Sequence, residues 1–179
     1  MTDIKLVKKA VKGNERAFET LITNDSDKLY RTAYLYVRNK DDALDVLQET
    51  TYKAFISIKH LKNPEYFSTW LTKILIRTAY DVLKKKKRNV LTGDIFFENI
   101  TENKTDKIES RIDITNAIST LKHDYQSVII LFYYHDLSIA NIAETMDKPE
   151  GTIKPHLHRA KMELKKALKG ANYYEQGMA

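Results

Sequence analysis

Carboxylates recur at helical spacing in the segment KDDALDVLQETTYKAF, residues 40–55. Asp41 or Asp42, Asp45 and Glu49 follow one another every three or four residues, so on a helix they share one face. Three carboxylates invite a metal-dependent phosphotransferase interpretation. A two-metal site, however, gathers ligands from separate elements around a cleft, whereas a stripe on one helix is typical of an exposed or docking face. The sequence therefore favours a docking surface, with the metal enzyme as the alternative.

Cations and aromatic side chains gather further along the chain. The run KKKKR, residues 84–88, is by itself typical of a solvated helix end. Arg77, Tyr80 and Lys84 are spaced by three and four residues and extend the cationic strip along one helix face. Cations beside aromatics that stack on unpaired bases are what single-strand nucleic-acid binding requires. Tyr66 is the better stacking candidate nearby, because Trp70 fits the core better.

The histidines near the C-terminus do not form a metal site. His156 and His158 are two residues apart and point to different sides of a helix. The chain contains no cysteine, which removes thiolate ligands, thiol nucleophiles and disulfides together. The sequence shows no glycine-rich phosphate loop and no Ser-His-Asp arrangement. We therefore expect no catalytic residue, no metal, no cofactor and no small-molecule substrate.

Composition indicates which elements hold these side chains. Five glycines and three prolines in 179 residues favour helices joined by short loops. A net charge of +6 suits a polyanionic partner. The N-terminus lacks a secretory signal, and no apolar run reaches the roughly 18 residues of a membrane span. These features predict a soluble, cytoplasmic protein.

Apolar periodicity predicts helices in the first half of the chain. One stripe on the acidic helix is predicted from residues with helical spacing: Leu44, Leu47, Thr51, Ala54, Phe55 and Ile58. Asn39 is expected to end the preceding helix, and Asp41 or Asp42 to cap this one. Pro64 interrupts the pattern, and a long helix is predicted from about Phe67 into the basic run.

The C-terminal part predicts two helices joined by a tight turn. Ser138 is a good N-cap for the first helix, and a second apolar stripe follows the turn MDKP: Ile153, Leu157, Ala160, Leu164 and Leu168. This is the helix-turn-helix pattern, and polar and cationic residues cover the outer face of its second helix. Pro155 lies inside that second helix, where we expect a kinked but continuous helix.

We therefore predict an all-α protein of two small helical domains joined by a flexible acidic linker. The N-terminal domain is expected over residues 1–88, the linker over 89–109, the helix-turn-helix domain over 110–170 and a tail over 171–179. The linker holds five acidic and two basic residues. Its Phe96 and Phe97 are unusual for a spacer.

Three ordered stretches resemble the small bacterial extracytoplasmic-function (ECF) sigma factors of the sigma-70 superfamily. They are GNERAFETLITNDSDKLYRTAYLYVRNKDDALDVLQETTYKAF, FSTWLTKILIRTAYDVLKKKKR and LSIANIAETMDKPEGTIKPHLHRAK. Order and spacing agree over roughly residues 13–168. The resemblance implies a transcription initiation factor, not an enzyme, whose partners are core RNA polymerase, promoter DNA and an anti-sigma factor that is often membrane-bound.

The resemblance also implies roles for individual positions. Polymerase docking would involve Asp42, Asp45, Gln48 and Glu49. The −10 element would contact Leu61, Lys62, Asn63, Tyr66, Phe67, Trp70, Arg77, Tyr80, Lys84 and Lys85, with Phe67 and Trp70 beneath a base pocket. The −35 element would contact Thr152, Lys154, Pro155, His156, His158 and Arg159.

This sequence departs from the family pattern at three positions. Asn141 replaces a common Glu and weakens the capping box with Ser138. Pro155 and His156 replace a common Ser and Arg, which predicts weaker −35 contacts. A stand-alone helix-turn-helix regulator is the alternative function.

Overall fold

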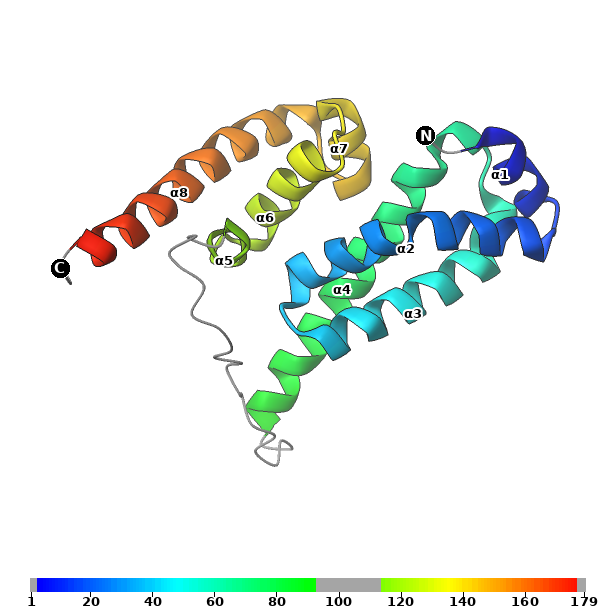
Figure 1. The fold of residues 1–179 in the computed structure, drawn as a ribbon. Helices are drawn as coiled ribbons and strands as arrows, with labels where there is room; N and C mark the ends of the chain where they lie inside the picture. The colour runs from blue at the N-terminus through cyan, green and yellow to red at the C-terminus, as the bar shows by residue number, and fades with distance from the viewer. Residues whose placement is uncertain (1–2, 93–113, 177–179) are drawn as a thin grey trace.

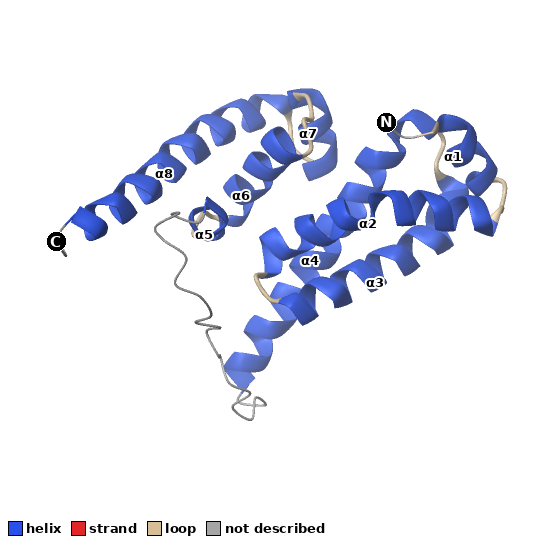
Figure 2. Cartoon of the chain, in the orientation of Figure 1, coloured by secondary structure: helices blue, strands red, loops and turns tan. Residues whose placement is uncertain are grey.

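The computed structural model describes residues 3–92 and 114–176, which form helices and turns without any strand (Figures 1 and 2). The N-terminal helices are α1 (Ile4–Val11), α2 (Glu15–Val37), α3 (Lys40–Ser57) and α4 (Phe67–Thr92), with the 3-10 turns η1 (Ile58–His60) and η2 (Pro64–Tyr66) between α3 and α4. The C-terminal elements are α5 (Ile114–Ser119), α6 (His123–Ile129), the π-helical turn η3 (Ile130–Tyr134), α7 (Ile139–Met146) and α8 (Glu150–Gln176). The predicted all-α fold is confirmed.

Helix α3 packs on α2 and α4 through small side chains. Its buried residues are Ala43, Val46, Thr50 and Ala54. The predicted stripe was therefore partly wrong, because Leu44 and Phe55 are 49% and 45% exposed. Small residues let the three helices approach closely, and the larger apolar side chains remain on the outer face of α3.

The turn between α2 and α3 also differs from the prediction. Arg38 adopts a left-handed conformation, with φ +57°, and its N–H donates to the Tyr34 carbonyl at 2.9 Å, which ends α2. The Asn39 Oδ1 atom accepts from the Asp42 N–H at 3.0 Å, so Asn39 begins α3 and does not end α2. Asp41 and Asp42 lie in the first turn, where carboxylates favour the helix dipole.

Helices α7 and α8 form the predicted helix-turn-helix. The Ser138 Oγ atom accepts from the Asn141 N–H at 3.2 Å, which confirms the N-cap. Ile153, Leu157 and Ala160 of α8 are buried, and the helix continues through Pro155 as predicted.

The N-terminal and C-terminal helices pack against each other, so the buried residues of both join one hydrophobic cluster. Helix α4 contacts α7, and α2 contacts α5. At the centre of the contact the Tyr36 hydroxyl donates to Ser127 Oγ at 3.0 Å, and Gln126 Nε2 donates to the Leu35 carbonyl at 2.9 Å.

The predicted domain limits do not coincide with the helix ends. Helix α4 continues past residue 88, and α8 continues into the predicted tail. Phe96 and Phe97 lie outside the described residues.

Candidate polymerase and nucleic-acid interfaces

The outer face of α3 carries the predicted docking residues. Asp45, Gln48 and Glu49 are exposed, and Glu49 is 3.4 Å from the Lys53 ammonium. Asp42 is turned aside, because its side chain pairs with Lys86 of α4 and is only 14% exposed. In residues 3–92 and 114–176, no group of three acidic or histidine side chains is arranged to hold a metal ion. The stripe thus presents the carboxylates of Asp45 and Glu49 to solvent.

Sequence reasoning missed the apolar part of this surface. Leu44, Tyr52, Phe55 and Ile56 are between 45% and 60% exposed on α3. Tyr52 and Phe55 also border a shallow cavity shared with α2. The sequence could have indicated this exposed apolar face. The acidic helix has two apolar faces, and because the core is small, both cannot be buried in it.

The residues between α3 and α4 enclose a cavity of about 310 Å³, here called the loop cavity. Its walls are formed by His60, Leu61, Lys62, Asn63, Tyr66, Thr69, Trp70, Lys73, Glu144 and Thr145. The structure thus brings together five of the residues predicted for the −10 element. The last two wall residues belong to α7, which sequence reasoning did not anticipate.

Local interactions shape the loop cavity. The Asn63 Oδ1 atom accepts from the Glu65 N–H at 3.1 Å and caps η2, whose first residue is Pro64. Phe67 is fully buried, and its ring centroid lies 5.9 Å from that of Trp70. Phe67 therefore supports Trp70 from beneath, whereas Tyr66 is 45% exposed at the rim.

The cationic strip of α4 divides into two parts. Lys84 and Lys85 border an open basic groove of about 500 Å³ together with Asp81, Lys87 and Arg88. Nearer the loop cavity, the strip is in contact with the C-terminal domain. Tyr80 donates its hydroxyl to the His123 carbonyl at 2.9 Å and also bonds Ser127. Burial raises the pKa of Tyr80 to about 12.

Two cations of α4 bind one carboxylate of the helix-turn-helix. Lys73 Nζ lies 2.5 Å from Asp147 Oδ1 and donates to the Glu144 carbonyl at 2.9 Å. Arg77 pairs with the other oxygen of Asp147. The hydrogen bond from Lys73 is the largest influence on the pKa of Asp147 and lowers it; burial opposes this shift, and the hydrogen bond from Arg77 lowers the pKa further.

The outer face of α8 is open, with one exception. Lys154, Pro155, His158 and Arg159 are exposed, and Thr152 is partly exposed. His156, however, is turned towards α6, so the expected outward position is not observed. Its side chain is 20% exposed and lies 3.7 Å from Asp124, and its Nδ1–H donates to the Thr152 carbonyl at 2.6 Å. It adjoins the buried Leu157, which places it at the rim of the apolar face.

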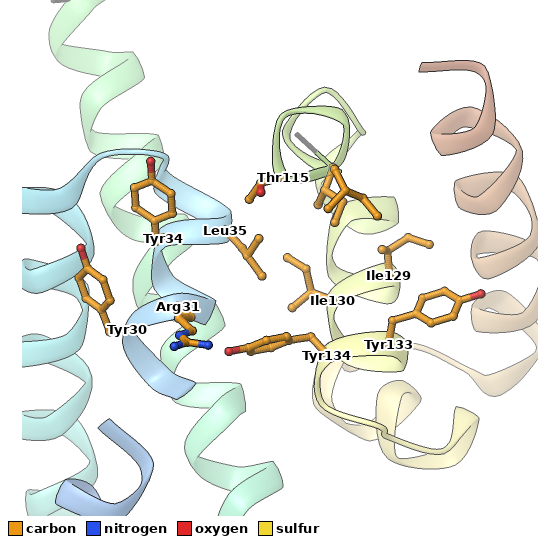
Figure 3. A pocket seen from close by; sticks show the side chains of 11 residues that line it. Tyr30, Arg31, Tyr34, Leu35, Thr115, Ile129, Ile130, Tyr133 and Tyr134 are labelled. Carbon is orange, nitrogen blue, oxygen red and sulfur yellow. The ribbon is translucent and has the colours of Figure 1, made fainter. Parts of the chain in front are cut away.

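An apolar cavity of about 410 Å³ lies between α2 and the C-terminal helices (Figure 3). Tyr30, Tyr34 and Leu35 line it from α2, and Ile130 and Tyr134 face them from η3. No motif indicated it, because its two walls are about a hundred residues apart in the sequence.

A partly buried histidine bridges the two domains near this cavity. His135 Nε2 is 3.0 Å from Thr32 Oγ1, and Nδ1 is 3.5 Å from Thr72 Oγ1. Burial, assisted by the charge of Lys28, lowers the pKa of His135 to about 4. The imidazole is therefore neutral in the folded protein near pH 7.

A helix-turn-helix beside a helix bearing cations and aromatics defines a two-domain DNA-binding protein. Comparisons with known families narrow the class. The model described as Sigma-70 region 2 matches residues 21–89, and that described as Sigma-70, region 4 matches residues 111–164.

No helix among the described residues has the length and apolar character needed to cross a membrane.

Sequence comparison with individual proteins also indicates a sigma factor. The chain is 38% identical to RNA polymerase sigma factor SigV of Bacillus subtilis over 141 residues, which is 79% of this chain and 84% of that protein. It is 28% identical to ECF RNA polymerase sigma factor SigW of Bacillus subtilis, over 92% of this chain and 96% of that protein. The chain belongs to the ECF sigma factors of the sigma-70 family.

Solved structures agree on the fold. The sigma factor RpoE of Bartonella quintana, in complex with the anti-sigma factor NepR, matches with a TM-score of 0.71 and 25% identity, over 85% of this chain and 96% of that one. CnrH, in complex with the cytosolic domain of CnrY, has the same fold, with a TM-score of 0.71 and 20% identity, over 94% of this chain and 97% of that chain.

Proposed function

We propose that this protein is a transcription initiation factor that binds core RNA polymerase and directs it to promoters. The observation that carries the proposal is the loop cavity, in which Tyr66 and Trp70 lie beside the cations Lys62 and Lys73. A cavity of about 310 Å³ is large enough to hold one base removed from its stack. The protein would act by binding and strand capture in the cytoplasm and is not an enzyme.

In the proposed mechanism, the N-terminal domain captures the opened −10 strand. An unpaired base enters the loop cavity and stacks on Tyr66 or Trp70, each stack contributing about 1–3 kcal/mol. Lys84 and Lys85 in the open basic groove hold adjacent phosphates, with Arg77 and Tyr80 between the groove and the cavity. Phe67 supports Trp70 and does not touch DNA itself.

The proposed polymerase contact combines charge and apolar area on α3. Asp45, Gln48 and Glu49 attract a basic partner surface, while the exposed Tyr52 and Ile56 supply area to bury. Charges at the rim of such a contact guide association, and apolar anchors hold the complex.

The C-terminal domain is proposed to recognise the −35 duplex through α8. Lys154, His158 and Arg159 face outward from the helix, and Thr152 lies beside them. We also infer an anti-sigma partner, because the solved structure of RpoE, which shares the fold, is a complex with the anti-sigma factor NepR.

The decisive experiment is a pull-down with core polymerase followed by in vitro transcription of fragmented genomic DNA, with RNA sequencing of the products. New start sites should depend on the protein. A folded Tyr66→Ala, Trp70→Ala variant should still bind polymerase but lose those start sites. Tight binding to duplex DNA without any association with polymerase would instead favour the stand-alone regulator.

A further inference from the structure

The C-terminal domain lies on the surface that is proposed to capture the −10 strand. Helix α7 supplies Glu144 and Thr145 to the wall of the loop cavity, and the turn after it supplies Asp147 to Lys73 and Arg77. Helix α6 supplies the partners of Tyr80. Three separate parts of the −10 surface are therefore in contact with the other domain.

The Asp147 carboxylate occupies the kind of position that a DNA phosphate needs. Its two oxygens bind Lys73 and Arg77 separately, and guanidinium and ammonium groups donate hydrogen bonds to the oxygens of a carboxylate and of a phosphate alike. Asp147 is charged at neutral pH, as an aspartate ordinarily is, and the bond from Lys73 lowers its pKa further. While this contact persists, neither cation is available to a phosphate.

The backbone at Asp147 fixes the carboxylate in this place. Asp147 is the C-cap of α7 in the left-handed conformation, with φ +52°, and its N–H is bonded within α7. Asp and Asn tolerate this conformation better than most residues. The turn of the helix-turn-helix thus presents the Asp147 carboxylate to α4.

We propose that the turn after α7 is an intramolecular competitor of the −10 strand, in which Asp147 takes the place of a phosphate and α7 restricts entry to the loop cavity. The inference rests on the proposed function, since it concerns the same −10 surface. The free chain in this closed arrangement binds single-stranded DNA weakly until the domains separate.

The competing contact between Asp147 and α4 is weak, because it is exposed to solvent. Arg77 and Asp147 have side-chain exposures of 62% and 57%, and exposed pairs contribute little because water and salt screen them. Removing the carboxylate should therefore raise single-strand affinity about threefold to tenfold. This range suits a contact that polymerase or DNA must displace.

The test uses the full chain and a fluorescein-labelled 12-nucleotide single strand of random sequence, with anisotropy as the readout. Asp147→Asn keeps the left-handed turn and removes the charge, and it should bind about threefold to tenfold more tightly. Asp136→Asn is the matched control. Asp136 is also left-handed, with φ +53°, is exposed in the same domain and makes no ion pair with another described residue, so its affinity should not change.

A second readout measures the distance between the domains. The chain has no cysteine, so Lys9→Cys and Lys166→Cys on exposed positions allow a fluorophore pair to be placed cleanly. Energy transfer should fall in the Asp147→Asn background and remain unchanged in the Asp136→Asn background.

The outcomes separate this inference from the proposed function. If Arg77→Gln weakens single-strand binding but Asp147→Asn changes neither affinity nor energy transfer, the competitor is refuted and the −10 surface stands. If Arg77→Gln and Trp70→Ala leave single-strand binding intact, the −10 assignment itself fails, and the competitor fails with it.

Discussion

Helices α3 and α4 belong to one domain and carry proposed binding surfaces of opposite charge, and the C-terminal domain covers part of the α4 surface. The outer face of α3 exposes Asp45, Glu49 and Tyr52 to solvent. The outer face of α4 is engaged by the C-terminal domain at Arg77 and Tyr80, whereas Lys84 and Lys85 beyond them border the open basic groove.

This difference indicates an order of events. A surface that is already exposed can meet its partner by collision, whereas a covered surface must first lose its intramolecular contacts. The polymerase docking proposed for α3 therefore requires no rearrangement of the contacts described here. The strand capture proposed for α4 does require one.

The largest expected effect is on the open face of α3. Asp45→Lys with Glu49→Lys should abolish binding to core polymerase, because charge reversal against a basic surface costs several kcal/mol. Glu19→Lys with Asp27→Lys on α2 reverses two other exposed charges and should leave binding intact. Surface plasmon resonance with immobilised polymerase measures both, and circular dichroism confirms the fold. Normal binding by the folded α3 variant would remove α3 from the docking surface.

The loop cavity should affect promoter opening and spare polymerase binding. A Gly/Ser sequence of equal length in place of residues 61–66 should prevent opening in a permanganate footprint, because the unpaired base loses about 1–3 kcal/mol of stacking. Since Leu61 is buried, the milder Tyr66→Ala is the second variant, with the exposed neighbour change Glu65→Ala as its control. A normal bubble in both loop variants would place strand capture elsewhere.

Acid should weaken the contact between the domains through His135. The folded-state pKa of about 4 lies below the ordinary 6.5, so the folded protein binds fewer protons than the unfolded chain between these values. The free energy of unfolding therefore falls as His135 is protonated. The contribution of neutral His135 is fully present above pH 6.5 and is lost as the pH falls towards 4, by at most about 3 kcal/mol.

Urea unfolding at a series of pH values measures this dependence. His135→Gln cannot titrate and should show a flatter profile between pH 6.5 and 4. Parallel profiles for the two proteins would show that His135 does not couple protonation to folding.

The smallest expected effects on binding are at Pro155 and His156. The sequence predicts that Pro155→Ser with His156→Arg strengthens binding to a −35 duplex and steepens its salt dependence. With His156 facing Asp124, we expect an increase in the salt slope of less than one phosphate contact.

Pro155→Ser alone should raise the unfolding free energy by about 1–3 kcal/mol, since an N–H donor returns to the helix. Anisotropy at several salt concentrations and urea unfolding measure these changes, and weaker duplex binding would show that Pro155 shapes α8 for its own promoter.

Local patterns predicted the helices well and the surfaces less well. Ser138, Ile153 and Leu157 lie as predicted because caps and 3.6-residue periodicity act within one helix. The acidic helix was assigned a stripe one residue out of phase, since the sequence offered two apolar faces and hydrophobicity alone selected the larger side chains.

Contacts between the domains could not be predicted from such patterns. Asp147 lies about seventy residues from Lys73 and Arg77 in the sequence, and no periodicity relates them. Ser127, which is hydrogen-bonded to Tyr36 and Tyr80, is likewise far from both tyrosines in the sequence. The loop cavity was predicted on its N-terminal side alone, because its α7 wall comes from the other domain.

The π-helical turn η3 determines the direction in which the side chains after it point. Its five residues close a ring from the His135 N–H to the Ile130 carbonyl, at 3.1 Å, which is one residue wider than an α-helical ring. Deleting one residue from this turn would restore α-helical bonding but rotate the next side chain by about 100° about the axis. His135 would then leave Thr32 and Thr72, so the registration of the two domains depends on a single extra residue.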